Sequence, residues 1–129
     1  HEVFHAIECH LNMTGDGYFD YDEWESYNPE GFNYDYDYIE NEMSTNWDYV
    51  LGDMDDEEDV YFIDIYSKSF PNEDRARIME YAMMESENDT GVFAYPALQG
   101  KLAYICERVR KGFDTSGWPE MTEWEKWIR

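Results

Sequence analysis

The sequence predicts a mainly α-helical domain with long acidic loops and little strand. Apolar residues recur at helical spacing in three segments, residues 1–11, 72–87 and 96–111. Residues 12–59 are instead rich in Asp, Glu, Asn and Tyr, which indicates an acidic, Tyr-rich loop region. Of the 129 residues, 43% are hydrophobic and 19% aromatic, enough for one packed core. We therefore expect residues 1–129 to form one domain, or part of one.

The net charge restricts the classes of partner. Nine Lys and Arg residues stand against 31 Asp and Glu residues, giving a net charge of −22. Such a chain repels nucleic acid and anionic membrane surfaces, and no apolar run is long enough for a membrane span. The acidic surface and Cys9 and Cys106, which can form a disulfide or remain two buried thiols, favour an extracellular or cell-envelope location.

The first expected helix covers residues 1–11. Its apolar residues are spaced for one helical face, and Asn and Gly in the following "NMTGDG" end it. Further along, residues 33–38 alternate in a way that suits a short strand or an extended loop. The acidic run at 52–59 indicates a solvated loop, with a cation-binding loop as the alternative. Residues 60–66 predict a buried strand or a single helical turn.

The second and third helices follow from their caps and apolar stripes. Asn72 can cap the helix over 72–87, where Glu73 and Asp74 suit the positive end of the dipole. Gly112 is expected to end the helix over 96–111. The stripes that we expect to be buried are Ala76, Met79, Ala82 and Met83 in the second helix and Leu98, Leu102, Ile105 and Val109 in the third. The tail can add a short helix whose Trp residues cover the core.

The first five residues, "HEVFH", have the spacing of a zinc-protease helix. On a helix, His1 and His5 are about 40° apart around the axis and about 6 Å apart along it, so both imidazoles can bind one metal. Glu2, about 100° from His1, can reach a water molecule in the open position of the metal and act as general base. His10 lies about 180° round the helix and is expected to point away, whereas Glu8 can accept a hydrogen bond from a ligand imidazole.

Joined to "FIDIYSKSFPNEDRA" (62–76), this motif resembles the gluzincin zinc metallopeptidases, a group that includes the catalytic domain of anthrax lethal factor and zinc-binding peptidases of gut bacteria. The resemblance implies that Glu73 is the third zinc ligand and that Tyr66, seven residues earlier, assists catalysis. Glu8 matches an acidic position of the family. Asp74 is an alternative to Glu73 as ligand and otherwise supports the ligands from outside. "WESYNPEGFNY" (24–34) is similar to an element of the bacterial members.

The resemblance implies a zinc-dependent endopeptidase that hydrolyses peptide bonds of a peptide or protein substrate. Tyr66 would donate its hydroxyl to the oxyanion, and Zn²⁺ would be the cofactor. The chain would form the carboxy-terminal helical part of a zincin-like domain, without the upstream sheet along which such enzymes bind substrate. We therefore expect low activity from this segment in isolation. Three alternatives stay open: Tyr66 as an ordinary core aromatic residue, Glu73 as a charge that only favours the helix start, and His1 and His5 as plain surface histidines.

Two other classes of function remain open. Residues 12–23 fit the calcium loop of an EF-hand, in which the ligands would be Asn12, Thr14, Asp16, Asp20 and Glu23. Against this interpretation, Asn replaces Asp at the first position, and Pro29 would cut the exit helix short. The chain could also be a non-catalytic binding module built on a protease fold.

Overall fold

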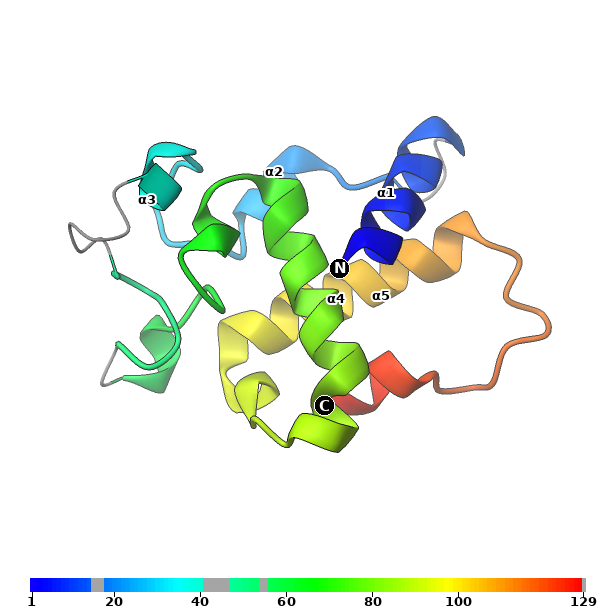
Figure 1. Ribbon diagram of the computed structural model, residues 1–129. Helices are drawn as coiled ribbons and strands as arrows, with labels where there is room; N and C mark the ends of the chain where they lie inside the picture. Colours follow the sequence, from blue (N-terminus) through cyan, green and yellow to red (C-terminus); the bar gives the residue numbers. More distant parts are fainter. Residues whose placement is uncertain (15–17, 41–46, 54–55, 129) are drawn as a thin grey trace.

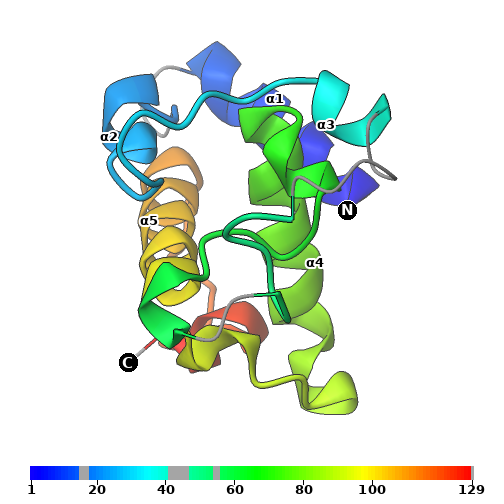
Figure 2. The same ribbon diagram turned by 90° about the vertical axis from the view of Figure 1, so that its left-hand side faces the viewer.

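The computed structural model describes residues 1–14, 18–40, 47–53 and 56–128 and is mainly helical, which confirms the predicted fold class. Three long helices dominate: α1 (Glu2–Thr14), α4 (Pro71–Asn88) and α5 (Pro96–Gly112). Helices α4 and α5 lie side by side and run in opposite directions (Figure 2), and α1 packs against both. Figure 1 shows the first residue close to α4. This arrangement brings the start of the chain close to α4.

A proline at the first position sets the start of both α4 and α5. Pro71 and Pro96 have the fixed backbone angle that a first helical residue needs, and Phe70 and Tyr95 before them are extended. The expectation that Asn72 caps α4 is therefore wrong, because Asn72 lies inside the helix. Glu73 and Asp74 become the third and fourth residues of α4.

The core forms where the apolar stripes of the long helices meet. Phe4 and Leu11 of α1 are 1% and 0% exposed, so the first helix is anchored by its apolar face. Apart from Met83, which is half-buried, the expected stripes are buried: Ala76, Met79, Ala82, Leu98, Leu102, Ile105 and Val109. Full burial of a Leu, Ile, Val or Met side chain contributes about 2 kcal/mol to the free energy of unfolding.

The region 12–59, expected to be a loop, contains short helices. They are α2 (Tyr21–Glu25), α3 (Asp37–Glu40) and the 3₁₀ turn η2 (Glu57–Asp59). Residues 32–35 have no regular secondary structure and lead through a turn at Tyr36 into α3, so the alternation at 33–38 does not produce a strand. The acidic residues at 56–59 are exposed, as expected of a solvated loop. Figure 2 shows the segment 21–40 running across one end of the α4 and α5 pair.

Residues 60–66 form no strand, and four of them, Val60, Phe62, Ile63 and Ile65, are buried. Phe62 makes one isolated parallel bridge with Val50, and the chain then turns into the 3₁₀ helix η3 (Tyr66–Lys68). Among the described residues no longer ladder pairs with this segment, so its apolar side chains pack without a sheet. Because η3 comes shortly before α4 in the chain, Tyr66 lies close to the start of α4.

The tail forms a 3₁₀ helix, η5 (Glu123–Trp127), which follows the turn η4 (Val92–Ala94) and α5 in sequence. Trp124 and Trp127 pack against the core, as expected. A capping box fixes the start of η5, with Thr122 and Glu125 as its two members.

Glu125 should make the stability of the fold pH-dependent. Arg110 binds both its carboxylate oxygens, at 2.7 and 2.6 Å, and Thr122 adds two hydrogen bonds. These contacts lower the pKa of Glu125 from 4.5 to about 2. Because the folded-state pKa is depressed, the stabilisation is complete above about pH 5 and is lost as the pH falls toward 2.

We expect Glu125→Gln to reduce the free energy of unfolding by about 2 kcal/mol at pH 7, and by less than half as much near pH 3. Urea unfolding across this pH range measures the difference, with the exposed Glu120→Gln as control. A Glu125→Gln deficit that stays constant with pH would contradict the assigned cause.

The two cysteines do not form a disulfide in this structure. Cys9 is an exposed free thiol on α1, and Cys106 is a buried free thiol on α5. Of the two expectations, the buried thiol holds for Cys106 only. No helix in the described parts of the chain is both long enough and apolar enough to cross a membrane.

Candidate metal centre

The imidazoles of His1 and His5 converge on one carboxylate oxygen of Glu73. The Nε2 atoms of His1 and His5 lie 2.9 and 3.2 Å from Glu73 Oε2. The imidazole rings are 4.9 Å apart in an edge-to-face arrangement. The three side chains are only 15%, 24% and 15% exposed. The structure thus brings together the three residues that the sequence suggested as ligands, although Glu73 is 72 and 68 residues away from His1 and His5 in the chain.

This donor set fits zinc in both chemistry and spacing. Two imidazole nitrogens and one carboxylate oxygen, with a fourth position open, form a catalytic zinc set. Neighbouring ligands of a tetrahedral zinc ion are about 3.4 Å apart, given metal–ligand distances of about 2.0–2.2 Å. The observed 2.9 and 3.2 Å are close to that spacing, so small side-chain shifts would accommodate the ion.

Glu2 lies at the mouth of this cluster. It is exposed, and one of its carboxylate oxygens lies within 4.8 Å of ligand atoms of both His1 and His5. That distance is compatible with the base role suggested for Glu2, and also with direct ligation. The position of Glu2 one residue after His1 on α1 explains why it stands beside the imidazoles.

Tyr66 reaches the cluster from η3. Its ring lies 5.9 Å from that of His1. Partial burial raises the pKa of Tyr66, and the neighbouring Glu73 carboxylate raises it further. The guanidinium of Arg77 packs 4.9 Å from the centre of the Tyr66 ring. Tyr66 is therefore part of the cluster rather than an ordinary core residue.

Glu80 also belongs to the cluster, and the sequence reasoning missed it. Glu80 Oε2 lies 3.7 Å from His1 Nδ1, a buried atom that has no hydrogen-bond partner among the described residues. Arg77 holds the same oxygen at 2.9 Å and pairs with Asp64. Glu80 is seven residues after Glu73, two helical turns along the same face of α4, and this spacing was the available signal. A carboxylate here can orient His1 from outside the coordination sphere.

We expect Glu80→Gln to weaken zinc binding about 10-fold, because it removes the charge that orients the His1 imidazole. Competition with a chromophoric chelator measures the affinity. Glu87→Gln, an exposed substitution on the same helix, is the matched control and should leave the affinity unchanged. Equal affinities for both variants would show that Glu80 does not support the ligand.

The structure gives Glu8 and Asp74 other partners than those expected. Glu8 is buried and pairs with Arg75 rather than with an imidazole. Asp74 is fully buried and pairs with Lys101 of α5 at 2.8 Å. Both expectations are corrected. Asp74 points about 100° away from Glu73 around α4, so the two do not face the histidines together, and Arg75 of α4 binds the Glu8 carboxylate. His10 points away as expected and stacks on Phe113.

Two clefts border the cluster. One, of about 390 Å³, contains His5 and Glu73 in its wall together with Cys9 and Met13 of α1. The other, of about 240 Å³, is lined by Tyr66 and Arg77 together with Ile39, Trp47, Asp64 and Ile65. The candidate centre therefore has open space on both sides.

The helices around the suggested calcium loop agree only in part with those of an EF-hand. Helix α2 begins at Tyr21, the tenth loop position, and Asp20 caps it, as an exit helix requires. However, α1 continues through Asn12 to Thr14, the third position, and Asp16 lies outside the described residues. The Glu23 carboxylate binds Arg108 and the Tyr104 hydroxyl. Calcium binding by this loop stays a prediction.

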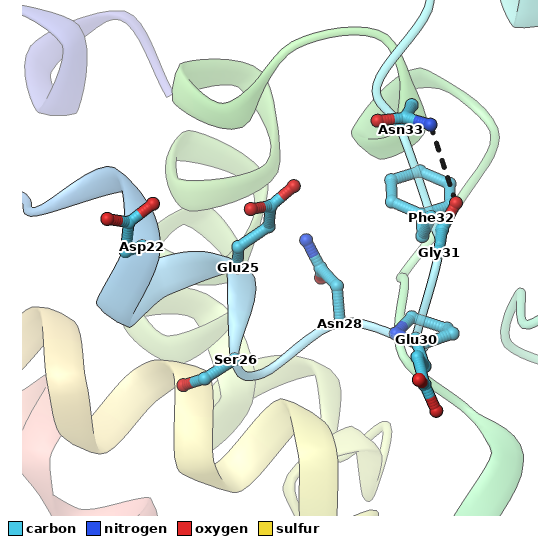
Figure 3. Close-up of a pocket in the computed structure, with 9 residues that line it drawn as sticks. Asp22, Glu25, Ser26, Asn28, Glu30, Gly31, Phe32 and Asn33 are labelled. Atoms are coloured by element: carbon cyan, nitrogen blue, oxygen red, sulfur yellow. Dashed lines mark hydrogen bonds between the residues drawn. The ribbon is translucent and has the colours of Figure 1, made fainter.

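A larger cavity, of about 460 Å³, lies between α2 and the following turn and shares no residue with the histidine cluster. Figure 3 shows the carboxylates of Asp22 and Glu25 on one side and Asn33 on the other, with the Asn28 side chain between them. Within the described residues, its carboxylates form no group close enough to share a metal ion.

Comparison with known proteins gives no independent assignment. No protein family, curated protein or solved structure matches the chain significantly.

Proposed function

We propose that the chain carries the zinc centre of a metallopeptidase. The observation that supports this most is the convergence of His1 and His5 on Glu73 Oε2, at 2.9 and 3.2 Å. His5 is held on α1 and Glu73 on α4, and His1 directly precedes α1 and accepts the His5 N–H at its carbonyl oxygen. The two helices pack together, and rigid elements are the supports that a catalytic metal needs.

A bound zinc ion would supply Lewis acidity, polarising the substrate carbonyl and making a water molecule acidic enough to attack it near neutral pH. The protein side chains do the remaining work. Glu2, beside the imidazoles, takes up the proton and returns it to the leaving amine. Tyr66, whose ring lies beside that of His1, donates its hydroxyl to the carbonyl oxygen as negative charge develops there. Glu80 keeps His1 oriented.

Net charge bears on the substrate class. With a net charge of −22, the protein attracts basic peptides and repels acidic ones. Peptides of equal length and graded charge should therefore be cleaved faster as their positive charge rises, and the difference should shrink at high salt.

Glu2→Gln tests the catalytic part of the proposal. We expect the variant to keep zinc but lose at least about 100-fold in peptide cleavage, because a positioned base contributes about 10²- to 10⁴-fold. Zinc-loaded protein is incubated with a mixed peptide library, and mass spectrometry identifies products over long incubations, so slow turnover is detected. Zinc-loaded wild type that cleaves no peptide, or a Glu2→Gln variant that remains equally active, would refute the proposal.

A further inference from the structure

The element "WESYNPEGFNY" (24–34) has no part in the metal centre, yet its polar residues meet at one atom. Trp24 Nε1 and Asn28 Nδ2 donate to the Tyr34 hydroxyl oxygen at 2.8 and 2.9 Å. That hydroxyl donates in turn to Asp74 Oδ2 at 2.7 Å. Two accepted bonds and one donated bond use the full hydrogen-bonding capacity of a tyrosine hydroxyl. Tyr34 is therefore held in a single orientation.

Asp74 is bound from a second direction by α5. Lys101 Nζ lies 2.8 Å from the same Oδ2 atom and also donates to the Tyr61 carbonyl oxygen at 2.7 Å. The ammonium group is 4.1 Å from the centre of the Phe62 ring. Asp74 and Lys101 are both fully buried. The network thus fixes Asp74 against the segment 24–34, the segment 61–62 and α5 at once.

Glu73 is the residue immediately before Asp74 in the first turn of α4. A first turn tends to fray, and Phe70 provides no side-chain cap to hold it. Three consecutive residues fix this turn instead. Glu73 faces the histidines of α1, Asp74 enters the buried network, and Arg75 pairs with Glu8.

Because these three residues share one helical turn, the position of Asp74 determines where the Glu73 carboxylate stands. A metal ligand must be held within about 0.5 Å of its working position, and loosely supported sites lose function. An apolar residue at position 74 could fill the same space but would not select one rotation of the turn. Hydrogen bonds with fixed donors can do so.

Resting on the proposed zinc centre, we infer that the buried network of Trp24, Asn28, Tyr34 and Lys101 around Asp74 positions Glu73 as a metal ligand. The members are positioning residues, since none of them touches the metal cluster. This gives the element 24–34 a role in the site although the cavity that it lines shares no residue with the histidine cluster.

A double-mutant cycle on zinc affinity tests the inference. Tyr34→Phe keeps the ring and removes the hydroxyl that joins the element 24–34 to Asp74. Tyr27→Phe removes a hydroxyl from the same aromatic cluster and is the matched control. We expect Tyr34→Phe to weaken zinc binding about 10- to 100-fold in the folded protein, and Tyr27→Phe to leave it unchanged. In a Glu73→Gln background, Tyr34→Phe should have no further effect.

The cycle separates positioning from a general structural role. If Tyr34 only stabilised the fold, its loss would lower the unfolding midpoint but leave zinc affinity equal to wild type, and the inference would be overturned. An equal loss of affinity with and without Glu73 would overturn it too. Should Tyr34→Phe fail to fold, Asn28→Ala removes one donor to the same hydroxyl and should weaken binding in the same Glu73-dependent way.

Failure of the underlying zinc proposal would be distinguishable. Wild type that binds no zinc, or binds it equally well after Glu73→Gln, refutes the zinc centre and the inference together. Wild type that binds zinc through Glu73 but is indifferent to Tyr34 refutes the inference alone.

Discussion

Glu73→Gln should weaken zinc binding by more than about 100-fold. Loss of a residue that only hydrogen-bonds to a ligand weakens metal binding by about 10- to 100-fold, and loss of a ligand itself should cost more. The substitution removes the anionic oxygen on which His1 and His5 converge. Two imidazoles and a neutral amide remain, and an amide is a much poorer zinc ligand than a carboxylate. Chelator competition, or metal content after dialysis, measures the loss.

Glu87→Gln provides the control for this prediction, since it makes the same chemical change at an exposed position of α4. Circular dichroism of both variants should show an intact fold, because Glu73 contributes nothing to the apolar core. Zinc binding that survives Glu73→Gln would mean that another group completes the coordination and that the proposed ligand set is wrong.

Asp74→Ala should reduce the free energy of unfolding by about 3–5 kcal/mol, the largest stability effect we expect of a single substitution here. The reason is that Lys101 would stay fully buried without its carboxylate partner. The Tyr34 hydroxyl would lose its acceptor as well. Urea unfolding at pH 7 measures the change.

Two comparisons identify the cause of that loss. Glu107→Ala breaks the exposed pair with Lys111 on α5 and should cost less than about 1 kcal/mol. The double variant Asp74→Leu with Lys101→Met removes both buried charges and should be more stable than Asp74→Ala. A loss for Asp74→Ala no larger than that for Glu107→Ala would show that the buried pair is not what holds the first turn of α4.

Local sequence patterns predicted the long helices, and the start of α5 at Pro96, but not the start of α4. The periodic stripes of α4 and α5 identify their buried faces because a helix must place residues three and four apart together. Asn72 suggested a cap, but Pro71 starts the helix one residue earlier. The short helices between 12 and 59 were missed because they are three to five residues long and carry no complete apolar stripe.

In the candidate site, too, some residues could be predicted from local motifs and others could not. His1, His5, Glu73 and Tyr66 were predicted together from motif spacing and family resemblance, and the structure brings these side chains into contact distance of one another. Partners that depend on packing between distant segments could not be predicted. Glu8 with Arg75 and Asp74 with Lys101 are such pairs, separated by 67 and 27 residues.

The coordination sphere of zinc tests the proposed centre most directly. X-ray absorption at the zinc edge, on protein loaded with one equivalent of zinc, should show two imidazole nitrogens and a carboxylate oxygen at about 2.0–2.2 Å, with the remaining position taken by a light atom. In the Glu73→Gln protein the spectrum should change or the metal should be lost. Zinc bound without imidazole ligands, or a wild-type spectrum identical to that of Glu73→Gln, would contradict a centre built from His1, His5 and Glu73.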